Sequence, residues 1–256
     1  MYNIDFKGDP IISNYNFIEL SRDDVLNSIL LSKLSVFQKS KITTKRLLFK
    51  SFHKYFQIKL LAIKLKNKHK IFSKCNYSEI DPYFLHSFIK FSHPYGITLS
   101  CDFIGANCQI SQLSTIGTNI KYQRFDELTY GVKPKIGFCI KTNPTSVISG
   151  PVHIGSFSII AAGAVVTKDV PPFSFVKGTN DILPIKKHHI KTFIHQLYNF
   201  FLLSDTPAEG ICWANGYFSL SREYSSFAQE IKKLFEKSSG EEELIKFFID
   251  HWNLKI

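Results

Sequence analysis

The sequence predicts a parallel β-helix with α-helical regions at both ends. A hydrophobic period of six residues runs through the middle of the 256-residue chain, and helical spacing flanks it on both sides. A period of six fits neither an α-helix nor a simple strand, but it fits a solenoid in which three short strands form each coil. Because 44% of the residues are hydrophobic, the chain has enough apolar side chains for one or two full-sized cores.

The repeat consists of two positions in each six-residue unit. The first position holds Ile104, Ile110, Ile116, Ile136, Thr142, Ile148, Ile154, Ile160 and Val166, and the second holds Cys108, Ser114, Ile140, Ser146, Val152, Ser158, Ala164 and Val170. In a solenoid, the first set stacks inward on flat faces, and the second lies inward near corners, where small residues fit. Each coil buries its faces against its neighbours, so stability grows by stacking. Residues 118–135 break the period and predict a loop that projects from one corner.

The flanks show helical spacing of apolar residues. Helices are predicted from 26 to 37, after a cap at Ser21, and then over 47–63, 185–203, 221–237 and 241–252. Residues 205–217, which contain Pro207, Gly210 and Gly216, predict a loop. The chain therefore divides into a helical, basic region at 1–78, a β-helix at 79–180 and a helical region at 181–256.

The formal net charge of +11 is unevenly distributed, since thirteen Lys or Arg residues and no Asp or Glu lie between Val25 and Ser78. Two interpretations of this segment stay open. It is a solvated helical face, or it contacts an anionic membrane or polymer. We expect no nucleic-acid partner.

The five cysteines are an odd number, and none forms a C-x-x-C pair. This favours reduced, buried thiols over disulfides or zinc, so we expect a cytoplasmic protein without a metal. The sequence contains no run long enough for a transmembrane helix. The first residues lack the layout of a signal peptide. The basic segment leaves open a peripheral position at the inner face of the membrane.

Four stretches resemble one known family. They are F-S-H-P-Y-G-I-T-L at 91–99, I-G-A-N-C-Q-I-S-Q-L-S-T-I-G at 104–117, P-K-I-G at 134–137 and I-A-A-G-A-V-V-T-K-D-V-P-P at 160–172. Together they are similar to the signature of the hexapeptide-repeat acyltransferases, in the serine acetyltransferase-like branch. The resemblance covers about 79–178. It implies a left-handed β-helix, acetyl-CoA as the acyl donor and a homotrimer.

The resemblance also implies that His93 is the general base. An acceptor hydroxyl is a poor nucleophile at neutral pH, and a nearby imidazole takes its proton as it attacks the thioester. A carboxylate on the other ring nitrogen fixes the tautomer and stabilises the imidazolium. Glu79 and Asp81 are both candidates for that carboxylate, although the spacing to His93 is one residue shorter than in the family.

Carried over by motif, the coenzyme A contacts are Thr118, Pro144 and Ala162. In the family, pantetheine runs along the coil axis between two subunits of the trimer. Pro144 and Ala162 lie one 18-residue coil apart in the sequence, as such a ligand requires. Pro144 has no N–H to donate. Lys168 is a candidate for a phosphate of coenzyme A, and its other interpretation is a solvated lysine.

The acceptor is expected to be a sugar hydroxyl of a bacterial capsular or surface polysaccharide, as the resemblance of the H-P-Y-G variant suggests. Serine acetyltransferases carry an acid before the signature histidine and an Arg and His before the P-K-I restart, where this chain has Ser92, Val132 and Lys133. Without those partners, a charged serine substrate would bind poorly. Two alternatives remain. One is a serine O-acetyltransferase, which the terminal Ile256 favours, and the other is a non-catalytic β-helix scaffold.

Overall fold

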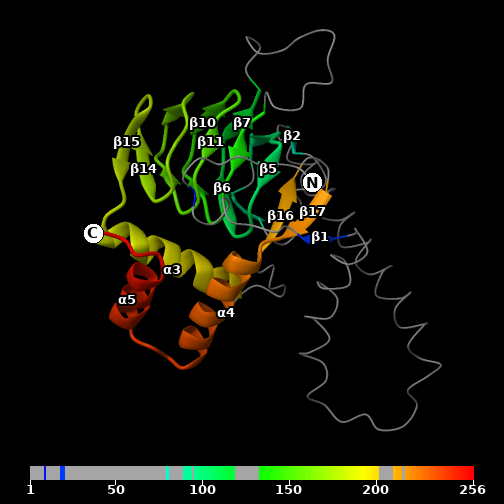
Figure 1. Ribbon diagram of the computed structural model, residues 1–256. Helices are drawn as coiled ribbons and strands as arrows, with labels where there is room; N and C mark the ends of the chain where they lie inside the picture. The colour runs from blue at the N-terminus through cyan, green and yellow to red at the C-terminus, as the bar shows by residue number, and fades with distance from the viewer. Residues whose placement is uncertain are drawn as a thin grey trace, which may run out of the picture.

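The computed structural model describes residue 9 and residues 18–20, 79–80, 89–93, 95–118, 133–201, 210–214 and 217–256. Within these residues, a parallel β-helix carries helices along one side and antiparallel strands at both ends (Figure 1). The expected helices over 26–37 and 47–63 lie outside the described residues, as does the basic segment 25–78 that contains them.

The coil strands form three sheets, and neighbouring coil strands in each sheet are parallel. The β4 sheet contains β2 (Glu79–Ile80), β4 (Thr98–Leu99), β7 (Thr115–Gly117), β10 (Val147–Ser149) and β13 (Val165–Val166). The β6 sheet contains β3 (Ile89–Ser92), β6 (Cys108–Ser111), β9 (Lys141–Thr142), β12 (Ile159–Ile160) and β14 (Ser174–Lys177). The β5 sheet contains β5 (Phe103–Ile104), β8 (Lys135–Ile136) and β11 (His153–Ile154).

The inward stack follows the six-residue period. All nine residues of the first repeat position are fully buried. Ile136 pairs with Ile154, one 18-residue coil further along the chain. The small residues of the second position are buried as well, and the Ser114 and Ser146 hydroxyls are hydrogen-bonded at 3.2 Å inside the coil. The predicted β-helix is therefore confirmed.

The break in the repeat is an insertion between two stacked coils. β7 ends at Gly117 and β8 begins at Lys135, yet Ile104 pairs directly with Ile136 across the interruption. Residues 119–132 lie outside the described part of the chain. The interruption therefore falls between β7 and β8, and the loop predicted to project there lies outside the described residues.

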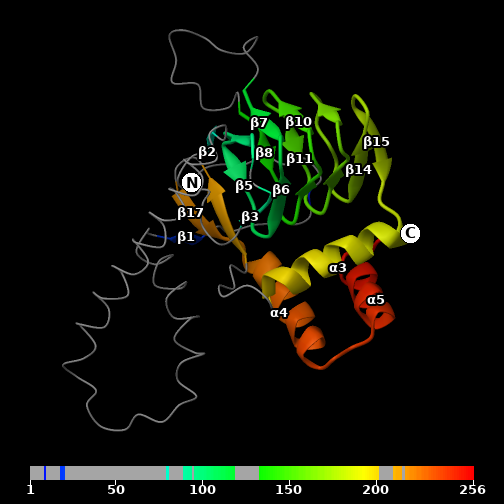
Figure 2. The ribbon, with the colours of Figure 1, turned by 180° about the vertical axis from the view of Figure 1, so that it is seen from behind.

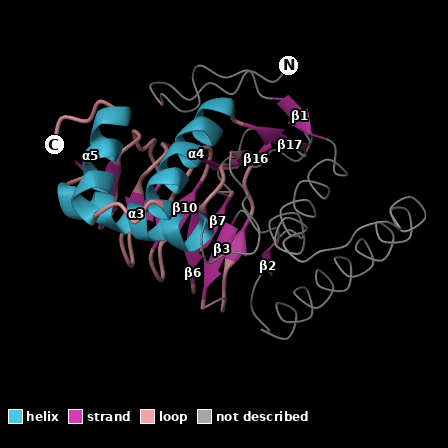
Figure 3. Ribbon diagram, turned by 90° about the horizontal axis from the view of Figure 1, so that it is seen from below, coloured by secondary structure: helices cyan, strands magenta, loops and turns pink. Residues whose placement is uncertain are grey.

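The helices after the coil match the three predicted ones: α3 (Lys187–Phe201), α4 (Arg222–Glu236) and α5 (Glu241–His251). The Ser221 hydroxyl caps α4 by accepting a hydrogen bond from the Tyr224 N–H at 3.2 Å. α3 follows the length of the coil on one side (Figure 2), and all three helices lie on that side (Figure 3).

An aromatic corner of the coil, formed by Phe138, Phe157 and Phe173, anchors these helices. This corner lies between the β5 and β6 sheets. The ring of Phe157 contacts Phe193 of α3 and Phe248 of α5, at centroid distances of 5.5 Å and 4.9 Å. Phe138 stacks on Tyr224 of α4 at 4.6 Å. The helices thus share one apolar core with the coil.

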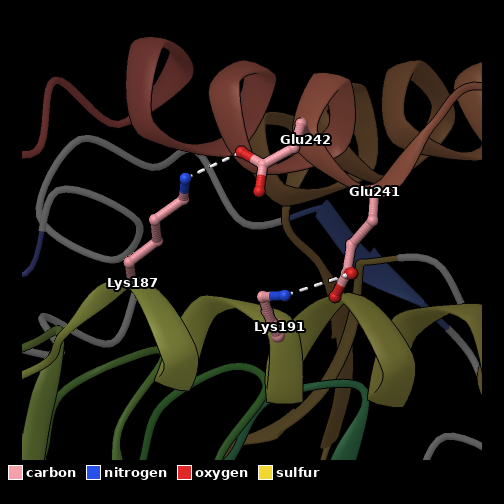
Figure 4. Close-up of polar contacts among 4 residues, drawn as sticks. All are labelled: Lys187, Lys191, Glu241 and Glu242. Carbon is pink, nitrogen blue, oxygen red and sulfur yellow. Dashed lines mark hydrogen bonds and ion pairs between the residues drawn. The ribbon is translucent and has the colours of Figure 1, made fainter.

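Two exposed ion pairs join α3 to α5 beside this core (Figure 4). The Lys187 ammonium lies 2.7 Å from the Glu242 carboxylate, and that of Lys191 lies 3.2 Å from Glu241. Solvent screens such pairs, so each contributes little to stability.

Short antiparallel strands, which the sequence did not reveal, close both ends of the coil. β15 (Asp181–Pro184) pairs with β14, and β16 (Ile211–Ala214) pairs with β5. β17 (Tyr217–Leu220) and β1 (Ile18–Leu20) extend the β5 sheet further. The predicted loop at 205–217 is therefore wrong over β16 and the first residue of β17, and neither 181–256 nor 1–78 is helical throughout. These strands form by pairing with an open sheet edge, and no period in their own sequence signals them.

Asp9 lies against the coil at the aromatic corner. Its buried carboxylate accepts a hydrogen bond from the Ser156 N–H at 2.6 Å. The neighbouring Gly155 has no room for a side chain, because an added Cβ would lie 2.2 Å from the Pro172 nitrogen. The chain is thus tightly packed here on both sides of Ser156.

Candidate active site

The histidine corner of the coil joins the β6 sheet to the β4 sheet. It comprises residues 93–97, 112–114, 143–146 and 161–164, one segment from each successive coil. The motif histidine, His93, comes directly after β3 in the first of these segments. Its side chain is exposed, and its backbone adopts the left-handed conformation with φ of 51°.

The corner that carries His93 is longer than the next one. Ser92 pairs with Ser111 before the corner, and Thr98 pairs with Thr115 after it. Five residues therefore span the first corner, 93–97, where three, 112–114, span the second. Because the strands on both sides remain in register and the interior of the coil is filled, the extra length must project outward. His93 thus lies where the coil is widened toward solvent.

Two of the predicted coenzyme A contacts lie at this same corner. The backbone hydrogen bonds from Thr145 N–H to the Gln112 carbonyl, and from Gly163 N–H to the Pro144 carbonyl, align the successive coils. Pro144 and Ala162 therefore fall in one line along the coil axis, on the side where His93 lies. Pro144 is half-buried and Ala162 is exposed. At about 5 Å for each coil, Pro144 lies on the order of 10 Å from the His93 coil.

The other two predicted contacts, Thr118 and Lys168, lie at the opposite edge of the β4 sheet. Thr118 follows β7, and Lys168 comes two residues after the end of β13. The Gly150 N–H donates to the Gly117 carbonyl at 3.0 Å, which keeps this edge in register between coils. Thr118 is half-buried and Lys168 is exposed. Within one chain, the structure does not bring these residues to the histidine corner.

Between these two edges, the β4 sheet is uncharged from β4 onward, and Glu79 of β2 starts the same column beside Thr98. The outward positions of the β4 sheet form a column of paired residues: Thr98, Thr115, Val147 and Val165. These side chains are half-buried or exposed. A flat column of Thr and Val residues can accept a close neighbour without desolvating a charge.

Of the two carboxylates predicted to assist His93, only Glu79 belongs to the described residues. Its backbone pairs with Thr98, so β2 lies beside β4, the strand that follows the long corner. Asp81 lies outside the described residues.

Two exposed side chains close to His93 were not among the residues predicted for the site. Tyr95 is 53% exposed and Leu113 is 45% exposed. The two residues are linked by the hydrogen bond from the Leu113 N–H to the Tyr95 carbonyl at 2.8 Å. Only the register of the first two coils brings them together, although Tyr95 belongs to the quoted H-P-Y-G motif.

The described cysteines are unsuited to nucleophilic catalysis. Cys101, Cys108, Cys139 and Cys212 are all buried. Burial raises the pKa of the Cys108 thiol to about 12 and holds that of Cys139 well above its usual value. Both thiols stay protonated at neutral pH, and the thiol form is a poor nucleophile.

No group of three or more His, Cys, Asp or Glu side chains in the described ranges is arranged to hold a metal ion. Among the helices that the structure describes, none is long and apolar enough to cross a membrane.

Comparisons with known proteins give only distant structural likenesses. No family model matches the chain. No curated protein matches it either. A serine acetyltransferase solved in complex with cysteine is 20% identical, with a TM-score of 0.32 over 43% of this chain and 40% of that one. The serine acetyltransferase of Neisseria gonorrhoeae is 20% identical, with a TM-score of 0.34 over 65% and 68%.

A maltose O-acetyltransferase from Clostridium difficile 630 is 17% identical, with a TM-score of 0.30 over 67% of this chain and 91% of that one. This chain spans about two-fifths of the length of the serine acetyltransferase solved with cysteine. At these TM-scores, the likenesses add nothing to what the strand pairing itself establishes. The pairing shows a three-sided parallel β-helix built on hexapeptide repeats, with an exposed histidine at a lengthened corner.

Proposed function

We propose that the chain is an acetyl-CoA-dependent O-acetyltransferase in which His93 is the general base. The observation that carries this proposal is the lengthened corner. It exposes the histidine of the H-P-Y-G motif on the line of corners that contains Pro144 and Ala162.

In the proposed reaction, the His93 imidazole accepts the proton of the acceptor hydroxyl as the oxygen attacks the thioester carbonyl carbon. The carbon–sulfur bond then breaks, and the imidazolium returns the proton to the leaving sulfur, so that acetylated acceptor and free coenzyme A result. A positioned base of this kind contributes roughly 10²–10⁴-fold to the rate. Glu79 and Asp81 are the candidates for holding the imidazole in the required tautomer.

The two separated sets of coenzyme A contacts support a homotrimer. In a cyclic assembly, one edge of a copy meets a different edge of the next copy. The edge with Thr118 and Lys168 would then face the histidine corner of a neighbouring copy, where Pro144 and Ala162 lie. The active site would be complete only at a subunit boundary.

A sugar hydroxyl is the proposed acceptor, on a bacterial capsular or surface polysaccharide. The Ser92 hydroxyl, just before the base, accepts a hydrogen bond from the Gln109 side-chain amide at 2.8 Å. Ser92 is uncharged, so this position offers no partner for the ammonium of a serine substrate. The exposed ring of Tyr95 instead offers a partly apolar surface beside His93.

An acceptor screen tests the proposal. The release of coenzyme A thiol from acetyl-CoA is measured with neutral oligosaccharides, acidic oligosaccharides and L-serine, and the acetylated product is detected by mass spectrometry. We expect turnover with a saccharide. Turnover with L-serine alone would establish the serine O-acetyltransferase alternative, and no turnover with any acceptor would favour a β-helix scaffold.

A further inference from the structure

A column of polar residues runs across the outer face of the β6 sheet. Lys90 of β3 pairs with Gln109 of β6, which pairs with Lys141 of β9. We call these three residues the lysine column. Neighbouring strands lie about 5 Å apart, so the two lysine backbones are separated by about 10 Å. Lys90 is exposed, and Gln109 and Lys141 are half-buried.

The same line of paired residues changes character where α3 covers it. The next two members, Ile159 and Phe175, are apolar. Ile159 is 4% exposed. The ring of Phe175 stacks on His189 of α3 at 4.7 Å. The helix therefore packs on the apolar end of the line at Phe175, whereas Lys90 at the other end is exposed.

The positive charge of the column is not balanced within its sheet. The strands β3, β6, β9, β12 and β14 contain no Asp or Glu. Of their three lysines, Lys177 forms an ion pair with Asp181, whereas neither Lys90 nor Lys141 forms one among the described residues. Burial, and then the repulsion by Lys90, lowers the pKa of Lys141. A bound anion would offset the repulsion between the two lysines and favour the charged form of Lys141.

The column lies beside the candidate base. Lys90 precedes His93 by three residues, which spans about 10 Å along an extended strand. The hydrogen bond from Gln109 to Ser92 joins the middle of the column to the residue before His93. A molecule with one hydroxyl at His93 can thus place a negative group at the column.

We propose that Lys90 and Lys141 bind a carboxylate group of the acceptor, which makes the acceptor an acidic saccharide. This inference rests on the proposed function, since it concerns the acceptor of the same site. Lysine binds an anion as a point charge on a flexible stem, so the column selects for charge rather than for one geometry.

A matched pair of probes tests the proposal by binding, without turnover. The probes are tri-galacturonate and its fully methyl-esterified, uncharged form, titrated into the full chain by calorimetry at low salt. The native protein should bind the charged probe more tightly. Replacing both lysines (Lys90→Gln and Lys141→Gln) should weaken that binding roughly tenfold, as expected for two ion pairs at the protein surface, and leave the ester unaffected. Lys135→Gln is the control, because Lys135 is half-buried on β8 of the β5 sheet.

Three outcomes would overturn the proposal. The native protein could bind both probes equally, or Lys135→Gln could weaken binding as much as the double variant does. Alternatively, the double variant could lose affinity for acetyl-CoA but not for tri-galacturonate, which would assign the lysines to the phosphates of coenzyme A. A failure of the proposed function would give a different result from a failure of this proposal. No acceptor in the screen would be acetylated, while the charge-dependent binding would persist.

Discussion

His93 combines exposure with a left-handed backbone, two properties that make its role testable without disturbing the fold. Asn tolerates positive φ better than most residues, so His93→Asn keeps the corner and removes the base. We expect kcat to fall by roughly two to four orders of magnitude, with little change in Tm. Steady-state kinetics and thermal unfolding check this.

The control is His195→Asn, which removes an exposed histidine of α3 far along the chain from the corner. Its kinetics should match those of the native chain. Full activity of a well-folded His93→Asn variant would exclude His93 as the base.

His189 predicts a pH dependence of stability. Its Nδ1 accepts a hydrogen bond from the Lys186 N–H at 3.0 Å, which requires the neutral ring. Burial against Phe175, and then the nearby His188 and Lys186, lowers the pKa of His189 below 6.5. The unfolded state therefore binds more protons below pH 6.5, and the contribution of this residue is lost as the pH falls.

Urea unfolding at pH 7.5 and pH 5.5 checks this prediction in the native chain and in His189→Gln. Glutamine can accept the same hydrogen bond but does not titrate. The native chain should lose more stability on acidification than the variant. Equal losses would mean that other groups, such as His251, whose pKa burial also lowers, account for the effect.

The motif around His93 was recognisable in the sequence, but the neighbours of His93 were not. The lysine column depends on the pairing of Gln109 with Lys141, which spans the insertion at 118–135. A sequence does not state which residues pair across an insertion of this length. Tyr95 and Leu113 come together for the same reason, through the register of coils rather than through spacing in the chain.

At the scale of elements, Phe157 holds the helices to the coil. Its ring is fully buried and contacts residues from α3, α4 and α5. Phe157→Ala should lower the free energy of unfolding by roughly 3–5 kcal/mol, because it leaves a cavity where these helices meet. Urea unfolding of the full chain measures this.

Phe175→Ala is the matched comparison, since Phe175 is only half-buried and its ring stacks on His189. Phe175→Ala should lower the free energy of unfolding clearly less than Phe157→Ala does. Equal losses for the two variants would show that the aromatic corner is not the main junction between helices and coil.

The elements that the sequence predicted well are those with a period of their own. The repeat positions are all buried, and α3, α4 and α5 begin and end within a few residues of the predicted bounds. β15 and β16 have no such period, because each consists of four residues that pair with an edge already formed. The position of the helices was equally hidden, since Phe138, Phe157 and Phe173 fall between the repeat positions.

At the scale of the whole molecule, the uncharged part of the β4 column, from Thr98 to Val165, predicts how copies assemble. In a closed ring of copies that meet edge to edge, the sheet between the two edges faces the axis. Val147→Lys places a charge in the middle of this column and should convert a trimer into single chains with loss of activity. Light scattering of the purified protein measures the mass.

His153→Lys, on the outward side of β11 in the β5 sheet, should leave the mass at three times that of one chain. An active native protein with the mass of a single chain would contradict the trimer.

The antiparallel strands at the two ends of the coil have a consequence for polymerisation. A parallel β-helix with bare ends presents unpaired backbone N–H and C=O groups, on which another copy can stack to form a fibre. Here, β15 covers the last coil on the β6 sheet, and β16 covers β5 on the β5 sheet. An antiparallel strand cannot continue the parallel register, so another coil cannot stack in register on these sheets. Removing β16 and β17 should therefore leave the edge of β5 unpaired and favour filaments over discrete particles.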